Sequence, residues 1–256
     1  MKKILFFDVD GTLFNSDKKL PQSAKDGIIK ARENGHEIAI ATGRAPFMIK
    51  ELLEELAITT YVTFNGQYVV HNGETIYSNG VEKDTLSNII AFGASRNEPV
   101  VFLDAEQMIA SVGGNTAILE SLKTLKYPYP SIDSSYYMYK SVYQTLIFMK
   151  EKDEKIYRDR FPQVEFVRWH PNSCDILPKG GSKAKGIELL IEKMNYKMED
   201  AIAFGDGLND IEMLQTVGLG VAMGNGHKET KKVADYLAGH VDEDGLAIAL
   251  KDLGLI

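Results

Sequence analysis

A short apolar segment ends in two aspartates near the amino terminus, and this combination constrains the fold more than any other stretch. Ile4-Leu5-Phe6-Phe7 is followed directly by Asp8-Val9-Asp10-Gly11-Thr12. Four successive apolar residues predict a strand that is buried on both faces, as in a parallel sheet covered by helices. Two carboxylates at the end of such a strand do not belong in a core, so they indicate a functional site.

The spacing of the two aspartates favours chemistry or metal binding. On an extended backbone Asp8 and Asp10 point to the same side, because one residue separates them. Two carboxylates in a small space repel each other unless a proton or a divalent cation lies between them. A plain turn is the alternative, since Asp and Gly are common turn residues. An EF-hand loop is excluded, because its sixth and twelfth positions would be Leu13 and Lys19.

The two ends of the chain share a pattern of buried strands and amphipathic helices, which predicts an open α/β sheet with parallel strands. Near the amino terminus the pattern comprises the strand 4–7, the helix 23–34, the strand 37–41, a helix from Pro46 and the strand 61–64. After residue 177 it comprises the helix 183–195, the strands 201–204 and 217–223, and a last helix near 246–253.

The middle of the chain has a different pattern, with short strands and turn signals. Asn65-Gly66 and Asn72-Gly73 are typical hairpin turns. Further strands are expected over 100–103, 108–112, 144–149 and 164–169, with two or three helices among them. We therefore expect a discontinuous core, 1–80 and 178–256, and an inserted domain of mixed α and β structure over 81–177.

Composition and charge narrow the class of protein. The chain has 256 residues, of which 44% are hydrophobic, and this is ordinary for a globular protein with a sizeable core. Its net charge of −7 disfavours a nucleic-acid partner, although a local positive charge could still bind a small anion. Cys174 is the single cysteine, so no intrachain disulfide is possible. No stretch approaches the ~20 apolar residues of a membrane span. We expect a cytoplasmic protein, monomeric or weakly dimeric, without a membrane partner.

Three polar loops, Asp8–Thr12, Thr42–Arg44 and Gly205–Asp210, each follow a predicted buried strand. They should meet, because ligands bind beyond the carboxyl ends of the strands in an open parallel sheet. Asp206 would then add a third oxygen donor to Asp8 and Asp10, which suits Mg²⁺. Gly205-x-Gly207 also resembles part of a dinucleotide fingerprint, but its third glycine falls on Asp210.

Two further segments carry groups that suit an anion. Thr42 offers a hydroxyl and nearby amides, although it could simply cap the following helix. Gly180-Gly181-Ser182-Lys183 opens a helix but lacks the spacing of a P-loop. Lys185 competes with Lys183 for the role of the cation. We favour Lys183, because the two lysines lie about 200° apart around a helix.

Four motifs together resemble those of the haloacid dehalogenase (HAD) superfamily, specifically its Cof-type phosphatases. They are Asp8-Val9-Asp10-Gly11-Thr12, Ala41-Thr42-Gly43-Arg44, Gly181-Ser182-Lys183 and Gly205-Asp206-Gly207-Leu208-Asn209-Asp210. The resemblance implies a Rossmann-like three-layer core and a large α/β cap of type IIB, inserted between the second and third motifs.

The resemblance also implies a role for each site residue. Asp8 would be the nucleophile and Asp10 the general acid/base. The Mg²⁺ cofactor would be held by Asp8, Asp206 and the Asp10 carbonyl group, and Asp210 would support the site by orienting Lys183 or metal-bound water. The groups expected to hold phosphoryl oxygens are the Val9 backbone amide, Thr42, Gly43, Lys183 and Asn209.

The function that follows is a Mg²⁺-dependent phosphatase. It would hydrolyse small phosphate monoesters, such as sugar phosphates, nucleotides or cofactor phosphates, through an aspartyl phosphate. One alternative is a phosphosugar mutase of the same superfamily, which would return the phosphoryl group to a sugar. Another is a non-catalytic protein that binds a phosphorylated ligand, and the intact Asp8 and Asp10 pair argues against it.

Overall fold

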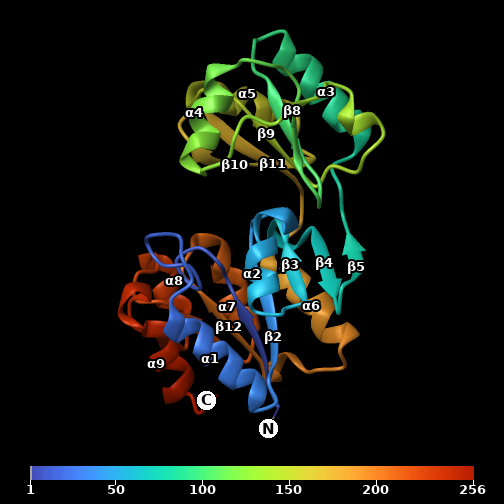
Figure 1. The fold of residues 1–256 in the computed structure, drawn as a ribbon. Coiled ribbons are helices and arrows are strands. Elements are labelled where there is room, and N and C mark those ends of the chain that lie inside the picture. The colour runs from blue at the N-terminus through green and yellow to red at the C-terminus, as the bar shows by residue number, and fades with distance from the viewer. Residues whose placement is uncertain (1) are drawn as a thin grey trace. The chain divides into compact units, whose positions relative to one another are not determined.

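The structure is a computed structural model and describes residues 2–256 (Figure 1). The chain folds as two compact units. The first unit contains the chain up to Arg44, Met48–Tyr77 and Gly181–Ile256, and the second contains Ala45–Phe47 and Ser78–Gly180.

The first unit is built on a sheet of eight strands within the described residues, in the order β14-β13-β12-β1-β2-β3-β4-β5. Its strands are β1 (Ile4–Phe7), β2 (Glu37–Ala41), β3 (Tyr61–Thr63), β4 (Tyr68–His71), β5 (Glu74–Ser78), β12 (Ala201–Gly205), β13 (Leu219–Ala222) and β14 (Tyr236–Leu237). The six strands from β14 to β3 pair in parallel, whereas β4 is antiparallel to β3. The predicted parallel sheet is thus confirmed.

Helices cover both faces of this sheet, which makes three layers (Figure 1). They are α1 (Gln22–Glu33), α2 (Lys50–Glu55), α6 (Lys183–Lys193), α7 (Ile211–Thr216), α8 (Lys228–Val233) and α9 (Gly245–Asp252). Leu5 and Phe7 pack into one core with α1 and α9, while Ile4 and Phe6 pack into a second core with α6 and α7. Because successive side chains of β1 alternate between two apolar cores, the strand is buried throughout. Its polar continuation can only lie at the edge of the sheet.

The second unit has a six-stranded sheet in the order β10-β11-β9-β6-β7-β8. Its elements are α3 (Lys83–Ala94), β6 (Val100–Leu103), β7 (Met108–Ala110), α4 (Thr116–Thr124), β8 (Ser131–Ile132), β9 (Gln144–Ile147), α5 (Glu151–Arg160), β10 (Val164–His170) and β11 (Ser173–Pro178). Apart from β7 and β8, neighbouring strands are antiparallel. Residues of α3 and α5, including the fully buried Tyr157, share one core with this sheet.

Several elements differ from the sequence-based expectation, and the short strands β8 and β14 are among those that no pattern indicated. The helix expected from Pro46 begins as a 3₁₀ turn, Pro46–Met48, before α2. Strand β11 was not anticipated, because Asp175 interrupts its apolar pattern and Pro178 ends it. It nevertheless lies between β10 and β9 and pairs with both. Over residues 2–256, no helix has the length and apolar character that crossing a bilayer requires.

Candidate active site

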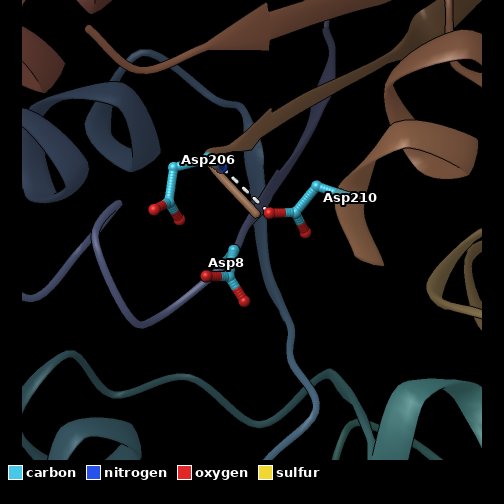
Figure 2. Close-up of side chains that lie close together, drawn as sticks. All are labelled: Asp8, Asp206 and Asp210. Carbon is cyan, nitrogen blue, oxygen red and sulfur yellow. Dashed lines mark hydrogen bonds between the residues drawn. The ribbon is translucent and has the colours of Figure 1, made fainter. Parts of the chain in front are cut away.

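Asp8 and Asp206 are neighbours because the strands they follow are neighbours. β1 and β12 pair in parallel with Phe7 opposite Phe204, and the Asp8 amide donates to the Phe204 carbonyl group at 2.9 Å. Asp210 comes from the loop after β12. Figure 2 shows the carboxylates of Asp8, Asp206 and Asp210 around a common space. One oxygen of each lies within 4.8 Å of the others. The carboxyl edge of the sheet thus gathers three acidic groups.

Lys183, at the start of α6, joins two of these carboxylates. Its Nζ lies 2.6 Å from Asp8 Oδ1 and 2.5 Å from Asp210 Oδ1, and the lysine side chain is only 1% exposed. Burial opposes its charge, but Asp210 and Asp8 outweigh burial and raise the pKa of Lys183. The lysine is therefore a fixed buried cation. Lys185, in contrast, pairs with Glu188 at 2.9 Å on the exposed side of α6.

Burial and neighbouring acids determine the charge of the nucleophile candidate. Burial raises the pKa of Asp8 to about 7, although Lys183 opposes this shift. Burial and the charge of Asp210 raise the pKa of Asp206 to about 6. The pocket therefore holds more negative charge than one lysine offsets, and a bound cation would relieve the excess.

Asp210 has a structural task in its own loop. Its Oδ2 accepts hydrogen bonds from the backbone amides of Asp206 at 2.9 Å and Gly207 at 2.8 Å. Its other oxygen binds Lys183. Because both oxygens already have partners, Asp210 shapes the loop and holds the lysine. A Cβ on Gly205 would lie 2.6 Å from Asp210 Cγ, so only glycine leaves room for this arrangement.

Asp206 is oriented by groups from two other loops. Thr12 Oγ1 donates to its Oδ1 at 3.3 Å, and Asn225 Nδ2 lies 3.5 Å from its Oδ2. Asn225 also donates to the Gly11 carbonyl group at 2.7 Å, and its Oδ1 accepts from the Val241 amide at 2.9 Å. Asn225 thereby links the first and fourth motifs.

Asp10 has different partners from Asp8. Arg44 donates two hydrogen bonds to its carboxylate, at 2.6 and 2.7 Å, and Lys18 Nζ lies 2.7 Å from Oδ1. Although burial alone would raise the pKa of Asp10, Arg44 and Lys18 lower it overall. Asp10 is therefore held ionised by two cations in this structure.

The remaining predicted residues surround the same edge of the sheet. Val9 is fully buried, and Thr42 is buried with its hydroxyl accepting from the Arg44 amide at 3.2 Å. Gly43 lies against the side chain of Asn65, where a Cβ would come within 3.0 Å of its amide nitrogen. Asn209 is exposed and donates to Asn65 Oδ1 at 3.0 Å.

The acidic cluster fits a divalent cation of the hard, oxygen-seeking type. Asp8 and Asp206 offer carboxylate oxygens, and burial together with neighbouring carboxylates raises the pKa of both groups. Mg²⁺ is commonly held by one or two carboxylates together with water and substrate phosphate. The residues present are consistent with that mode.

Comparisons with known proteins agree with this geometry. The sequence model of the haloacid dehalogenase-like hydrolase family matches residues 5–250. The chain belongs to this family. The predicted resemblance and the predicted class of enzyme, a hydrolase, are thus confirmed.

Individual relatives cover the full length. A Bacillus subtilis strain 168 protein named "Putative phosphatase YkrA" is 42% identical over 99% of this chain and 98% of its own. A crystal structure of a hypothetical protein from Geobacillus kaustophilus HTA426 is 45% identical, with a TM-score of 0.98 and full coverage of both chains. The HAD subclass IIB sugar phosphatase BT4131 is 33% identical, with a TM-score of 0.84 and full coverage of both chains.

Sequence reasoning did not anticipate several residues at the site, namely Lys18, Arg44 as a partner of Asp10, Asn65 and Asn225. Lys18 and Asn225 lie outside the four motifs, so no spacing pointed to them. Asn65 was recognised only as part of a hairpin turn, and its position two residues beyond β3 was the available signal.

Proposed function

We propose that this protein is a Mg²⁺-dependent phosphatase that hydrolyses small phosphate monoesters through an aspartyl phosphate on Asp8. The observation that carries the proposal is the buried Lys183, which bridges Asp8 and Asp210 beside Asp206. A carboxylate held against a fixed cation at a sheet edge is suited to attack an anionic phosphorus centre, because the cation offsets the repulsion.

In the first step a carboxylate oxygen of Asp8 forms a bond to phosphorus, and the bond between phosphorus and the alcohol oxygen breaks. Lys183 would offset charge on the phosphoryl oxygens, together with Thr42, Gly43, Asn209 and the Val9 amide. Bound Mg²⁺, held by Asp8, Asp206 and the Asp10 carbonyl group, would supply further neutralisation of phosphoryl charge.

Asp10 would manage the proton. It protonates the departing alcohol in the first step, and in the second step it takes a proton from the water that attacks phosphorus and releases Asp8. Arg44 and Lys18 keep Asp10 ionised in the structure described. Asp10 can therefore donate a proton only if substrate binding weakens its contacts with Arg44 and Lys18.

Selectivity would reside in the inserted region, residues 81–177, acting as a cap domain. The proposed roles of the site residues in the first unit involve only the phosphoryl group and the metal, so the leaving group would be recognised elsewhere. A small phosphorylated metabolite is the proposed substrate, and the sugar phosphatase among the structural relatives favours sugar phosphates as the first esters to try.

The test is phosphate release from a panel of sugar phosphates, nucleotides and cofactor phosphates, without any bisphosphate activator. We expect turnover that requires Mg²⁺ and stops in excess EDTA. Lys183→Met should lose at least ~100-fold in kcat/KM, whereas the exposed Lys185→Met should stay within about twofold of wild type. Turnover in EDTA, or the reverse order of the two lysine variants, would contradict the proposal. Activity only with a bisphosphate activator would indicate a mutase.

A further inference from the structure

The turn Phe64-Asn65-Gly66 has an unusual backbone. All three residues have positive φ angles, +50° for Phe64, +51° for Asn65 and +92° for Gly66. Glycine adopts this region freely and asparagine tolerates it, but a bulky residue such as phenylalanine rarely does. Such conformations persist where surrounding contacts determine them, and they occur often at functional sites.

Backbone contacts hold the turn against the second motif. The Phe64 amide donates to the Arg44 carbonyl group and the Asn65 amide donates to the Thr42 carbonyl group, both at 3.1 Å. The ring of Phe64 is fully buried and serves as an anchor. These two backbone hydrogen bonds and the buried ring therefore fix the position of the turn relative to the Thr42–Arg44 loop.

The turn is equally close to the third motif. A Cβ on Gly66 would lie 2.0 Å from the Ser182 carbonyl oxygen, and a Cβ on Gly186 would lie 3.2 Å from the Gly66 Cα. Only glycine allows the backbone of the turn to approach the start of α6 so closely. The turn thus lies between the loop of Thr42 and the helix that carries Lys183.

The side chain of Asn65 reaches the fourth motif. Asn65 Oδ1 accepts a hydrogen bond from Asn209 Nδ2 at 3.0 Å. The amide of an asparagine can turn either its oxygen or its nitrogen toward an anion, and only the nitrogen binds. Because Asn65 Oδ1 accepts one N–H of Asn209, it fixes which way the Asn209 amide is turned and leaves the second N–H to bind an anion.

We propose that Asn65 is a positioning residue for phosphate binding, which acts by holding the amide of Asn209 so that its second N–H reaches a phosphoryl oxygen. This inference rests on the proposed function, and it adds a fifth loop to the four motifs. The ligand class is an orthophosphate or phosphomonoester dianion. Left-handed backbone at residue 65 is required so that the side chain reaches Asn209 while the turn stays on the second and third motifs.

The test compares Asn65→Gly, Asn209→Ala and the double variant, with Asn72→Gly as a control. Glycine keeps the left-handed backbone and removes only the side chain. Asn72 is a matched residue, since it has φ of +51° in the turn between β4 and β5 and contacts His71 and Thr60 instead of the motifs. The measurements are the melting temperature, kcat and KM on a responsive ester, and calorimetric binding of inorganic phosphate with Mg²⁺ present.

We expect Asn65→Gly and Asn209→Ala each to weaken phosphate binding by about tenfold, with the larger kinetic effect on KM. The double variant should be no weaker than Asn209→Ala, because both changes remove the same contact. Asn72→Gly should bind phosphate as wild type does. Equal binding by Asn65→Gly and Asn72→Gly would overturn the inference, and so would additive losses of about 100-fold in the double variant.

The failure of this inference is distinguishable from the failure of the proposed function. A wild-type protein that hydrolyses esters, with Asn65→Gly equal to Asn72→Gly, contradicts only the role of Asn65. A wild-type protein that binds inorganic phosphate but releases none from any ester contradicts only the phosphatase, and the binding series still decides the role of Asn65. A protein that does neither contradicts both.

Discussion

At the scale of the residue, the two cations around Asp10 decide at which pH its carboxyl group holds a proton. Arg44 and Lys18 both contact the carboxylate and lower its pKa. A general acid must be protonated when the leaving group departs. If Asp10 is the general acid, as we propose, its contacts with Arg44 and Lys18 should limit catalysis at high pH for esters whose leaving groups need a proton.

Removal of one cation should relax this limit. In Lys18→Met the pKa of Asp10 rises, so a larger fraction of Asp10 is protonated at a given pH. We expect the basic limb of the kcat profile for an alkyl phosphate to move to higher pH, while p-nitrophenyl phosphate, with its good leaving group, changes little. Lys19→Met is the matched control, because Lys19 is the adjacent exposed lysine. Identical profiles for the two variants would contradict the role of Asp10 as the acid.

At the scale of the element, helix α6 places Lys183 because it packs closely on the sheet. A Cβ on Gly186 would lie 2.3 Å from a methyl carbon of Val62, which lies in the middle of β3. The helix would have to move away from the sheet to accept it. The lysine one turn earlier would then lose its place between Asp8 and Asp210.

Gly186→Ala should therefore destabilise the protein by ~1–3 kcal/mol and lower kcat/KM, even though alanine favours helix by about 1 kcal/mol. Gly27→Ala is the matched change in α1. Its new Cβ would lie 3.0 Å from Cδ1 of Leu250 and at ordinary contact distances, 3.8 and 4.0 Å, from Ala247. A small shift of one leucine side chain would make room, so we expect neutral or slightly raised stability. Urea unfolding of both variants measures the difference. Equal free energies of unfolding would show that the close packing of α6 is unimportant.

The elements around the site could be predicted wherever the spacing of apolar and polar residues identifies a helix or a buried strand. Helical spacing predicted that Lys183 and Lys185 lie on opposite sides of the helix, and the position of Lys183 at the helix start favoured it. The structure buries Lys183 against Asp8 and leaves Lys185 exposed. The convergence of three loops followed from the parallel sheet, because strand ends share an edge. The contact of Asn65 with Asn209 joins residues 144 positions apart, and no local pattern indicates which turn will reach which loop.

At the scale of the whole molecule, we expect the acidic cluster to make stability depend on pH and on a bound metal ion. An unfolded Asp titrates near ~3.9, whereas the pKa of Asp8 is raised to about 7 and that of Asp206 to about 6. Between these values the folded state binds more protons than the unfolded state. The contribution of these two carboxyl groups to the stability of the metal-free protein is therefore fully present below pH ~4 and is lost as pH rises toward 7.

Mg²⁺ should reverse this loss, because it binds the ionised carboxylates of the folded state. We expect the melting temperature in EDTA to fall from pH 5 to pH 8 by more than it does with Mg²⁺ present. Asp175→Asn is an informative control, since burial also raises the pKa of Asp175 to about 7, in the second unit. This variant should lose part of the pH slope and keep the response to Mg²⁺. An equal Mg²⁺ effect at pH 5 and pH 8 would contradict a carboxylate site.

The most direct test of the central claim is the turnover of Asp8→Asn. The amide keeps the shape of the side chain but removes the attacking oxygen anion, so no aspartyl phosphate can form. The measurement is the rate of phosphate release with Mg²⁺ on the best ester from the panel, after the melting temperature has shown that the variant is folded. Our account predicts a loss of at least ~1000-fold in kcat. Phosphate release by a folded Asp8→Asn at more than a few per cent of the wild-type rate would contradict it.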